Sequence, residues 1–272
     1  MLLTVDGRPV HAATGGRPLD APLDAGGPVA VLLHGSGMDN TVWALQSRFL
    51  AHRGVGVLSV DLPGHGRSAG PPLPTVEALG EWVVALLDAA GVGRALLAGH
   101  SLGALVALAA AGRAPERVGA LALLGAADRM PVHPGLLAAA TAGEAEAIRM
   151  VVGWAFARRA HIGGSPAPGM WMVGAALRLM EREAPGVLGV DLGACDRFAD
   201  APRIAAAIAC PTTVVIGSAD RMTPPKAGRR LAALIPGAEI VELPGVGHMM
   251  AVEAPEATAR ALLGAATRQE RT

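Results

Sequence analysis

The sequence predicts an α/β fold in which a mostly parallel sheet carries helices on both faces and a helical cap is inserted late in the chain. Two observations support this prediction. Short runs rich in Val, Leu and Ile alternate with longer helix-like stretches, and one long segment breaks the alternation. With 272 residues, of which 51% are apolar and 17% charged, the chain is long enough to bury one substantial core.

The predicted strands are nearly continuous apolar runs bounded by turn residues, which is typical of parallel strands buried on both faces. They cover residues 28–33, 54–60, 94–98, 119–124, 212–216 and 239–243. Ahead of them, residues 2–5 and 8–12 predict a short hairpin around Asp6-Gly7.

Four helices are predicted between or after these strands, over residues 75–90, 101–112, 225–234 and 254–267. Thr75 provides an N-terminal cap for the first helix and Gly91 ends it. Pro255 falls in the first turn of the last helix, where proline is tolerated.

The alternation stops between residues 124 and 212, where about 85 residues contain no clear strand, too many for an ordinary connection. Helical stretches are predicted there over 144–160, 170–183 and 196–208, separated by loops rich in Gly and Pro. We therefore predict an α/β core made of residues 1–127 and 209–272, with a helical cap over residues 128–208.

The strongest local signal for chemistry is Gly99-His100-Ser101-Leu102-Gly103, which follows an apolar run and opens an alanine-rich helix. A serine on a tight strand-to-helix turn is strained, and side chains two positions to either side would collide, so glycine stands at both positions. The turn lifts the hydroxyl clear of the sheet and aims the helix N-terminus at a developing oxyanion. The motif predicts that Ser101 is a nucleophile.

A serine nucleophile needs a base that accepts its proton. Of eight histidines, His248 is the best placed, because it follows the last predicted strand in a glycine-containing loop. The imidazole in turn needs a carboxylate, and Asp220, after the strand at 212–216, gives the chain order Ser101, Asp220, His248. Asp128 follows an earlier strand and is the rival acid. We favour Asp220 and expect Asp128 to cap or hinge the insertion.

Over nearly its whole length the chain resembles the α/β-hydrolase superfamily. Five segments match in order: His34-Gly35-Ser36-Gly37, Asp61-Leu62-Pro63-Gly64-His65-Gly66-Arg67-Ser68, the serine turn, Asp220-Arg221-Met222-Thr223-Pro224, and Gly247-His248 with Glu253-Ala254-Pro255-Glu256. The match is specific for the fold and poorly specific for the substrate. The resemblance implies that the amides of Ser36 and Leu102 form an oxyanion hole and that His34, His65 and His100 are structural.

Apolar side chains close to these motifs indicate an apolar substrate pocket. The expected lining residues are Met38, Trp43, Met222 and Met249 in the core, and Trp154 and Trp171 in the cap. No basic cluster in the cap marks a charged substrate.

The sequence thus favours a hydrolase that cleaves a small to medium apolar carboxylic ester or lactone through an acyl-enzyme. The same residues would suit a hydrolase of carbon–carbon bonds in ring-cleavage diketones, which would need a basic clamp such as Arg158, Arg159 or Arg178. A cofactor-free perhydrolase and a non-enzymatic ligand receptor are further alternatives.

Composition narrows the expected partners. The 23 basic and 23 acidic residues balance and form no basic stripe, so nucleic acid is not expected as a partner. Cys195 and Cys210 are too few for a disulfide framework and are expected to be reduced thiols. With no secretory signal or membrane span in the sequence, the expected location is the cytoplasm. We expect a small-molecule ligand and no metal or cofactor, and leave homo-oligomerisation open.

Overall fold

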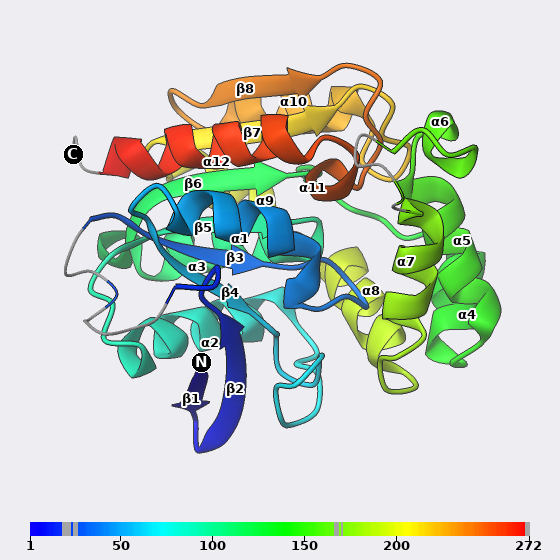
Figure 1. Ribbon diagram of the computed structural model, residues 1–272, viewed down its shortest axis with the longest axis horizontal. Coiled ribbons are helices and arrows are strands. Elements are labelled where there is room, and N and C mark those ends of the chain that lie inside the picture. Colours follow the sequence, from blue (N-terminus) through cyan, green and yellow to red (C-terminus); the bar gives the residue numbers. More distant parts are fainter. Residues whose placement is uncertain (18–22, 24–26, 166–168, 170, 270–272) are drawn as a thin grey trace.

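An eight-stranded sheet runs through the molecule, and Figure 1 shows helices on both of its faces and a further group of helices beyond one end. The computed structural model describes residues 1–17, 23, 27–165, 169 and 171–269. The strands are β1 (Leu2–Val5), β2 (Arg8–Ala13), β3 (Val29–Leu33), β4 (Gly56–Val60), β5 (Ala95–His100), β6 (Val118–Leu124), β7 (Thr212–Gly217) and β8 (Glu239–Leu243). Each predicted strand is present, with its bounds shifted by at most two residues.

The strand order across the sheet is β1-β2-β4-β3-β5-β6-β7-β8. β1 pairs antiparallel with β2 and β2 with β4, and the remaining neighbours pair in parallel. The prediction of a mostly parallel sheet is confirmed. Because parallel strands finish at the same edge, the loops that follow β3, β5, β7 and β8 meet there, which is where such sheets bind ligands.

Helices cover both faces of the sheet. They are α1 (Ala44–Ala51) and α12 (Pro255–Arg268) on one face, and α2 (Val76–Ala89), α3 (Leu102–Arg113) and α10 (Pro225–Leu234) on the other. Alternate residues of β3 point to opposite faces, so Val31 and Leu33 join the core under α2 and α3, and Ala30 and Leu32 join the core under α1 and α12. In the described ranges, none of the helices is long and apolar enough to cross a lipid bilayer.

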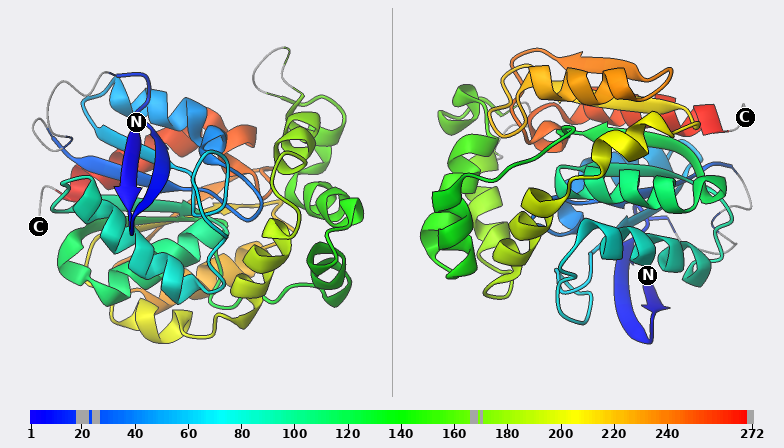
Figure 2. Two further views of the ribbon diagram at one scale, coloured as in Figure 1. Left: turned by 90° about the horizontal axis from the view of Figure 1, so that it is seen from below. Right: turned by 180° about the vertical axis from the view of Figure 1, so that it is seen from behind.

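Between β6 and β7 the described chain is helical. The helices are α4 (Pro134–Thr141), α5 (Ala145–Ala155), α6 (Arg158–His161), α7 (Met172–Met180), α8 (Val187–Arg197) and α9 (Ala201–Ala206). Figures 1 and 2 show α4 to α8 gathered beyond the end of the sheet where the parallel strands finish. Both α8 and α9 also pack against α3 of the core. The cap boundaries at 128 and 208 stay a prediction.

Two helices predicted in this segment differ from the structure. Residues 144–160 do not form one helix, because α5 ends at Ala155 and the following backbone bonds to the segment around His248. Residues 196–208 are divided between the end of α8 and α9, because Pro202 lacks an amide and fits only the first turn of a helix. The predicted start at 170 lies outside the described residues. The sequence does not predict α1, α4 or most of α8. In α4 and α8, alanine and glycine weaken the helical periodicity.

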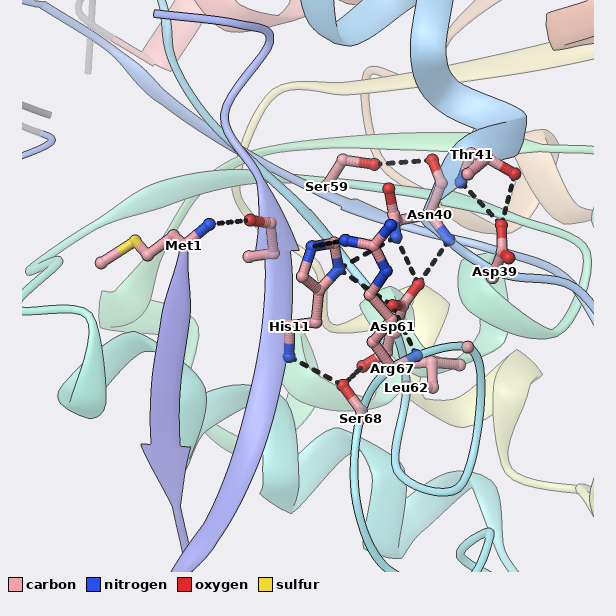
Figure 3. A network of polar contacts seen from close by, with 12 residues as sticks. Met1, His11, Asp39, Asn40, Thr41, Ser59, Asp61, Leu62, Arg67 and Ser68 are labelled. Carbon is pink, nitrogen blue, oxygen red and sulfur yellow. Dashed lines mark hydrogen bonds and ion pairs between the residues drawn. The ribbon is translucent and has the colours of Figure 1, made fainter. Parts of the chain in front are cut away.

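The loop after β4 is fixed by one buried carboxylate, as Figure 3 shows. Asp61 accepts hydrogen bonds from the Asn40 amide and side chain at 2.7 and 2.6 Å, from the Arg67 amide at 3.0 Å and from His11 Nδ1 at 3.0 Å. Burial by itself raises the pKa of a carboxyl, but the bonds from Asn40 and Arg67 hold the pKa of Asp61 below its ordinary value. The network therefore ties the segments after β3 and β4 together.

Candidate active site

Ser101 stands on the turn between β5 and α3 in a backbone conformation that few residues adopt. Its φ is 54° and its ψ −118°, and Asp6 is the one other described non-glycine residue with a positive φ. The turn requires glycine on both sides. A Cβ on Gly99 would lie 2.0 Å from the carbonyl oxygen of Gly103, and a Cβ on Gly103 would lie 2.4 Å from that of Leu33.

The imidazole of His248 lies against the carboxylate of Asp220, with 2.8 Å between Nδ1 and Oδ2. The carboxylate also accepts from the amides of Met222 and Thr223, at 2.8 and 2.9 Å, and from the Thr223 hydroxyl at 2.7 Å. Burial by itself raises the pKa of a carboxyl, but His248 and Thr223 hold the pKa of Asp220 below its ordinary value. Asp220 is therefore an ionised acceptor for the ring.

The second ring nitrogen of His248 is left without a partner. Because Nδ1 faces a carboxylate, a neutral ring would carry its proton on Nδ1 and keep a lone pair on Nε2. Nε2 is buried and accepts no hydrogen bond from any residue that the structure describes. His248 and Ser101 line the same cavity.

Two backbone hydrogen bonds and one ring contact hold His248 in place. Its amide donates to the Ala155 carbonyl at 2.7 Å, and its own carbonyl accepts from His100 Nε2 at 2.8 Å. The ring packs on Gly125, where φ is 57° and a Cβ would lie 2.9 Å from Cε1. Burial, and then the neighbouring His248, lower the pKa of His100 to about 3, so His100 is a neutral donor.

Glu253, at the end of α11 (Met250–Glu253), ties the His248 loop to the end of α5. Its side chain is buried, and its two oxygens accept from the amides of Gly247 and Ala157, each at 3.1 Å. Burial raises the pKa of Glu253, and the two backbone bonds oppose that rise. A Cβ on Gly247 would lie 2.5 Å from the Ala157 nitrogen, so the close approach depends on glycine.

The turn after β3, residues 34–37, lies beside Ser101. A Cβ on Gly35 would be 3.3 Å from the Ser101 Cβ. Leu102 is the first residue of α3, so its amide has no partner within the helix. Within the described part of the chain, neither this amide nor that of Ser36 donates a hydrogen bond to another residue. Both amides are therefore free of protein acceptors within the described residues.

His34 supports this turn from beneath. Its Nδ1 donates to the Gly35 carbonyl at 2.9 Å, and its Nε2 accepts from the Leu62 amide at 3.0 Å. Burial, and then the charge on His65, lower the pKa of His34 to about 4. A neutral ring that donates at one nitrogen and accepts at the other therefore fixes the turn.

Asp191 on α8 holds the same turn from the side of the helices between β6 and β7. Its Oδ2 accepts from the Gly37 amide at 2.8 Å and from His65 Nε2 at 2.9 Å, while His65 Nδ1 donates to the Pro63 carbonyl at 3.0 Å. Both ring nitrogens of His65 face acceptors, so the ring carries both protons. Burial alone lowers the pKa of a histidine, but Asp191 raises that of His65 to about 9.

Asp191 was not expected from the sequence. The only local signal is an acidic residue in an otherwise apolar stretch, Val187-Leu188-Gly189-Val190-Asp191-Leu192.

The rival acid, Asp128, lies elsewhere and pairs with Arg230 of α10, with distances of 2.9 and 3.4 Å. The structure therefore brings His248 together with Asp220.

The cavity in front of Ser101 has a volume of about 180 Å³ and mostly apolar walls. Of the residues expected to line it, Met38, Trp154 and Met222 do so, and Met249 lines a neighbouring cavity. Two expectations are wrong. The 3₁₀ helix Asn40–Trp43 turns Trp43 into the core between α1 and the sheet, and Trp171 is 65% exposed at the start of α7 and lines neither cavity.

Arg221 also lines the cavity, although the sequence pattern does not predict it there. It lines the cavity beside Met222 and forms no ion pair with another described residue. The sequence feature that indicates a place for Arg221 near the site is its position directly after Asp220. Of the arginines considered as a clamp, Arg158 and Arg159 line neither cavity, and Arg178 lines the neighbouring one, paired with Glu181 at 2.7 Å.

In the described ranges, no three His, Cys, Asp or Glu side chains come together in a way that could hold a metal ion. Cys195 and Cys210 are free thiols. Burial raises the pKa of Cys195 to about 12, so its thiol stays protonated although it lines the cavity.

Comparisons with known proteins agree on one family. The sequence profile of the alpha/beta hydrolase family matches residues 30–261. RutD from Klebsiella pneumoniae (strain 342), provisionally named a carbamate hydrolase, is 34% identical over 259 residues, covering 82% of this chain and 85% of that protein. The pimeloyl-acyl-carrier-protein methyl ester esterase of Chromobacterium violaceum is 33% identical over 233 residues, covering 82% and 87%. The solved enol-lactonase from Burkholderia xenovorans LB400 superposes with a TM-score of 0.84 at 26% identity, covering 98% of this chain and 100% of that one.

Proposed function

The chain belongs to the alpha/beta hydrolase family and has its fold, and from this premise we propose that it is a serine hydrolase of small to medium carboxylic esters or lactones. In this proposal Ser101 is the nucleophile, His248 the base and Asp220 the acid that orients the base. The family and the names of the relatives support the broader conclusion that the protein is a hydrolase.

The proposed reaction has two halves. In the first, Ser101 Oγ attacks the carbonyl carbon as its proton passes to His248 Nε2, and the oxyanion binds the amides of Ser36 and Leu102. The bond to the alcohol then breaks, the alcohol takes the proton from His248, and an acyl-serine remains. In the second half a water molecule gives His248 a proton and attacks the acyl carbon. The acid leaves as the proton returns to Ser101 Oγ.

One observation supports the proposal most directly. Among the residues that the structure describes, none is a hydrogen-bond partner of the buried Nε2 of His248, a residue that lines the same cavity as Ser101, while Nδ1 is bound to an ionised carboxylate 2.8 Å away. An unsatisfied buried nitrogen costs about 1–3 kcal/mol, so its presence calls for an explanation. Acceptance of a proton from the serine supplies one.

The cavity and the relatives support the substrate class. Its walls are mostly apolar, which favours uncharged groups around the scissile bond. One relative is named a methyl ester esterase and one structural neighbour an enol-lactonase. Both names describe cleavage of a bond between an acyl carbon and an oxygen.

Arg221 favours a second candidate, hydrolysis of a carbon–carbon bond in an acidic ring-cleavage diketone. Such a substrate needs a cation to hold its carboxylate, and Arg221 is the one Lys, Arg, Asp or Glu among the described residues of the cavity wall. The two candidates share Ser101, His248 and Asp220, so only the substrate distinguishes them.

The test compares hydrolysis of p-nitrophenyl butyrate and of a ring-cleavage diketone by the wild type and by Ser101→Ala. We expect the wild type to prefer the ester and Ser101→Ala to lose about 10⁴-fold or more in kcat. A preference for the diketone would favour the second candidate. Binding of either compound without turnover would point to a ligand receptor and contradict the proposal.

A further inference from the structure

A second cavity lies behind Met38. It has a volume of about 390 Å³, against about 180 Å³ for the cavity that contains Ser101. Among the described residues, Met38 alone lines both cavities. The walls of the second cavity come mainly from the segment after the turn at residues 34–37, from α7 and from the segment after His248. They include Val42, Leu45, Phe156, Met172, Leu179 and Met249.

The interior of the second cavity offers no free charge. Its polar lining residues are Thr41, Arg178 and Arg182. The Arg178 side chain is 84% exposed and pairs with Glu181, and that of Arg182 is 67% exposed and pairs with Asp39. Both arginine side chains are therefore largely in solvent, and each is paired with an acidic residue. A ligand group inside would meet apolar side chains on nearly every side.

The residue that the two cavity walls share, Met38, has a flexible side chain. Met38 directly follows the turn at residues 34–37. Its amide donates to the Gly35 carbonyl at 3.3 Å, and this bond fixes the backbone of Met38. Its side chain is 4% exposed and unbranched, with three rotatable bonds. A change of its rotamer alters the shared wall and leaves the backbone hydrogen bond of the turn in place.

We propose that the second cavity receives the distal part of a medium-length aliphatic ester, and that Met38 determines how far the chain extends into it. This inference rests on the proposed ester hydrolysis at Ser101. The smaller cavity accommodates the scissile bond and a short group, and a longer chain enters the space that shares a wall with it. Each methylene that leaves water there adds to binding. Leu45, 44% exposed, continues the apolar path to the surface.

Three variants test this assignment through the ratio of kcat/KM for p-nitrophenyl decanoate to that for p-nitrophenyl butyrate. Met38→Ala truncates the side chain that both cavity walls share and should raise the ratio at least about tenfold. Met130→Ala, the matched control, makes the same truncation in the catalytic cavity alone and should change the ratio less than about threefold. Ala175→Phe fills the second cavity from an exposed position on α7, where folding is not at risk, and should lower the ratio about tenfold.

The outcomes separate this inference from the proposed function. A ratio that stays unchanged in both Met38→Ala and Ala175→Phe, while butyrate is still hydrolysed, overturns the two-cavity assignment and leaves ester hydrolysis standing. Should Met38→Ala fail to fold, the ratio in Ala175→Phe decides alone. A wild type that hydrolyses neither ester overturns the proposed function, and this inference with it.

Discussion

His65 Nε2 and Asp191 Oδ2 lie 2.9 Å apart, and this buried pair joins the loop after β4 to helix α8, which lies between β6 and β7 in the chain. Each side chain is 1% exposed. Asp191 also accepts the Gly37 amide, so the pair helps to fix the turn that carries Ser36. The protonation of His65 therefore affects both the stability of the fold and the geometry of the proposed oxyanion hole.

We expect stability to fall on the alkaline side as His65 loses its proton. The pKa of His65 is raised from 6.5 to about 9, so its stabilising contribution is complete below pH 6.5 and is lost as pH rises through 9. The difference between these two pKa values corresponds to about 3 kcal/mol in the free energy of unfolding. Urea unfolding across this window should show the decline in the wild type, and His65→Gln should flatten it. Equal slopes for the two proteins would contradict this account.

Replacing the two candidate acids should distinguish them. Asp220→Asn keeps the shape of the side chain but favours the wrong tautomer of His248, so kcat should fall about 10⁴-fold. Asp128→Asn breaks a partly exposed ion pair with Arg230, and its kcat should stay within about twofold of the wild type. Turnover of p-nitrophenyl butyrate measures both. An inactive Asp128→Asn beside an active Asp220→Asn would reverse the assignment.

A methyl group at Gly125 should displace the proposed base. Gly125→Ala places a Cβ 2.9 Å from His248 Cε1, and a shift of about 1 Å in a catalytic group costs on the order of 10²-fold in kcat. Gly91→Ala is the matched control, because Gly91 has a φ of 65° against 57° at Gly125 and no atom within 4 Å of the added Cβ. Both variants share the backbone strain, so similar losses of kcat would show that the ring is not the cause.

Glu253→Gln should impair the placement of His248 more than the binding of substrate. The amide nitrogen of glutamine would face the Gly247 or the Ala157 amide, donor against donor, at a cost of about 1–3 kcal/mol. We expect a lower melting temperature and a several-fold lower kcat with little change in KM. Glu256→Gln, on a side chain that is 72% exposed and paired with Arg260, should change neither. A raised KM at unchanged kcat in Glu253→Gln would contradict this role.

The strands and the serine turn could be predicted because their causes are local. Each buried strand is an apolar run between turn residues, and Gly99 and Gly103 stand where any Cβ would strike a neighbouring backbone atom. The end of α5 at Ala155 could not be predicted. It depends on hydrogen bonds with His248 and Glu253, about a hundred residues further along the chain, which local periodicity does not encode.

The residues of the candidate site also fall into two groups, those with a local sequence signal and those placed by distant contacts. Asp220 and His248 follow recognisable strands, so the sequence indicated both. The position of Asp191 depends on how α8 packs against the core, and the side chain of Trp43 depends on the turn of a single 3₁₀ helix. Neither position follows from composition or spacing. Asp191 was therefore not predicted, and Trp43 was wrongly predicted to line the cavity.

Covalent labelling of Ser101 tests the central claim most directly, because it requires an activated hydroxyl and no knowledge of the substrate. The wild type is treated with a fluorophosphonate at neutral pH, and the adduct is located by peptide mass spectrometry, with Ser101→Ala and His248→Ala alongside. We predict one adduct on Ser101 in the wild type, none in Ser101→Ala and much slower labelling in His248→Ala. A folded wild type that stays unlabelled, or that carries its adduct on another residue, would contradict the account.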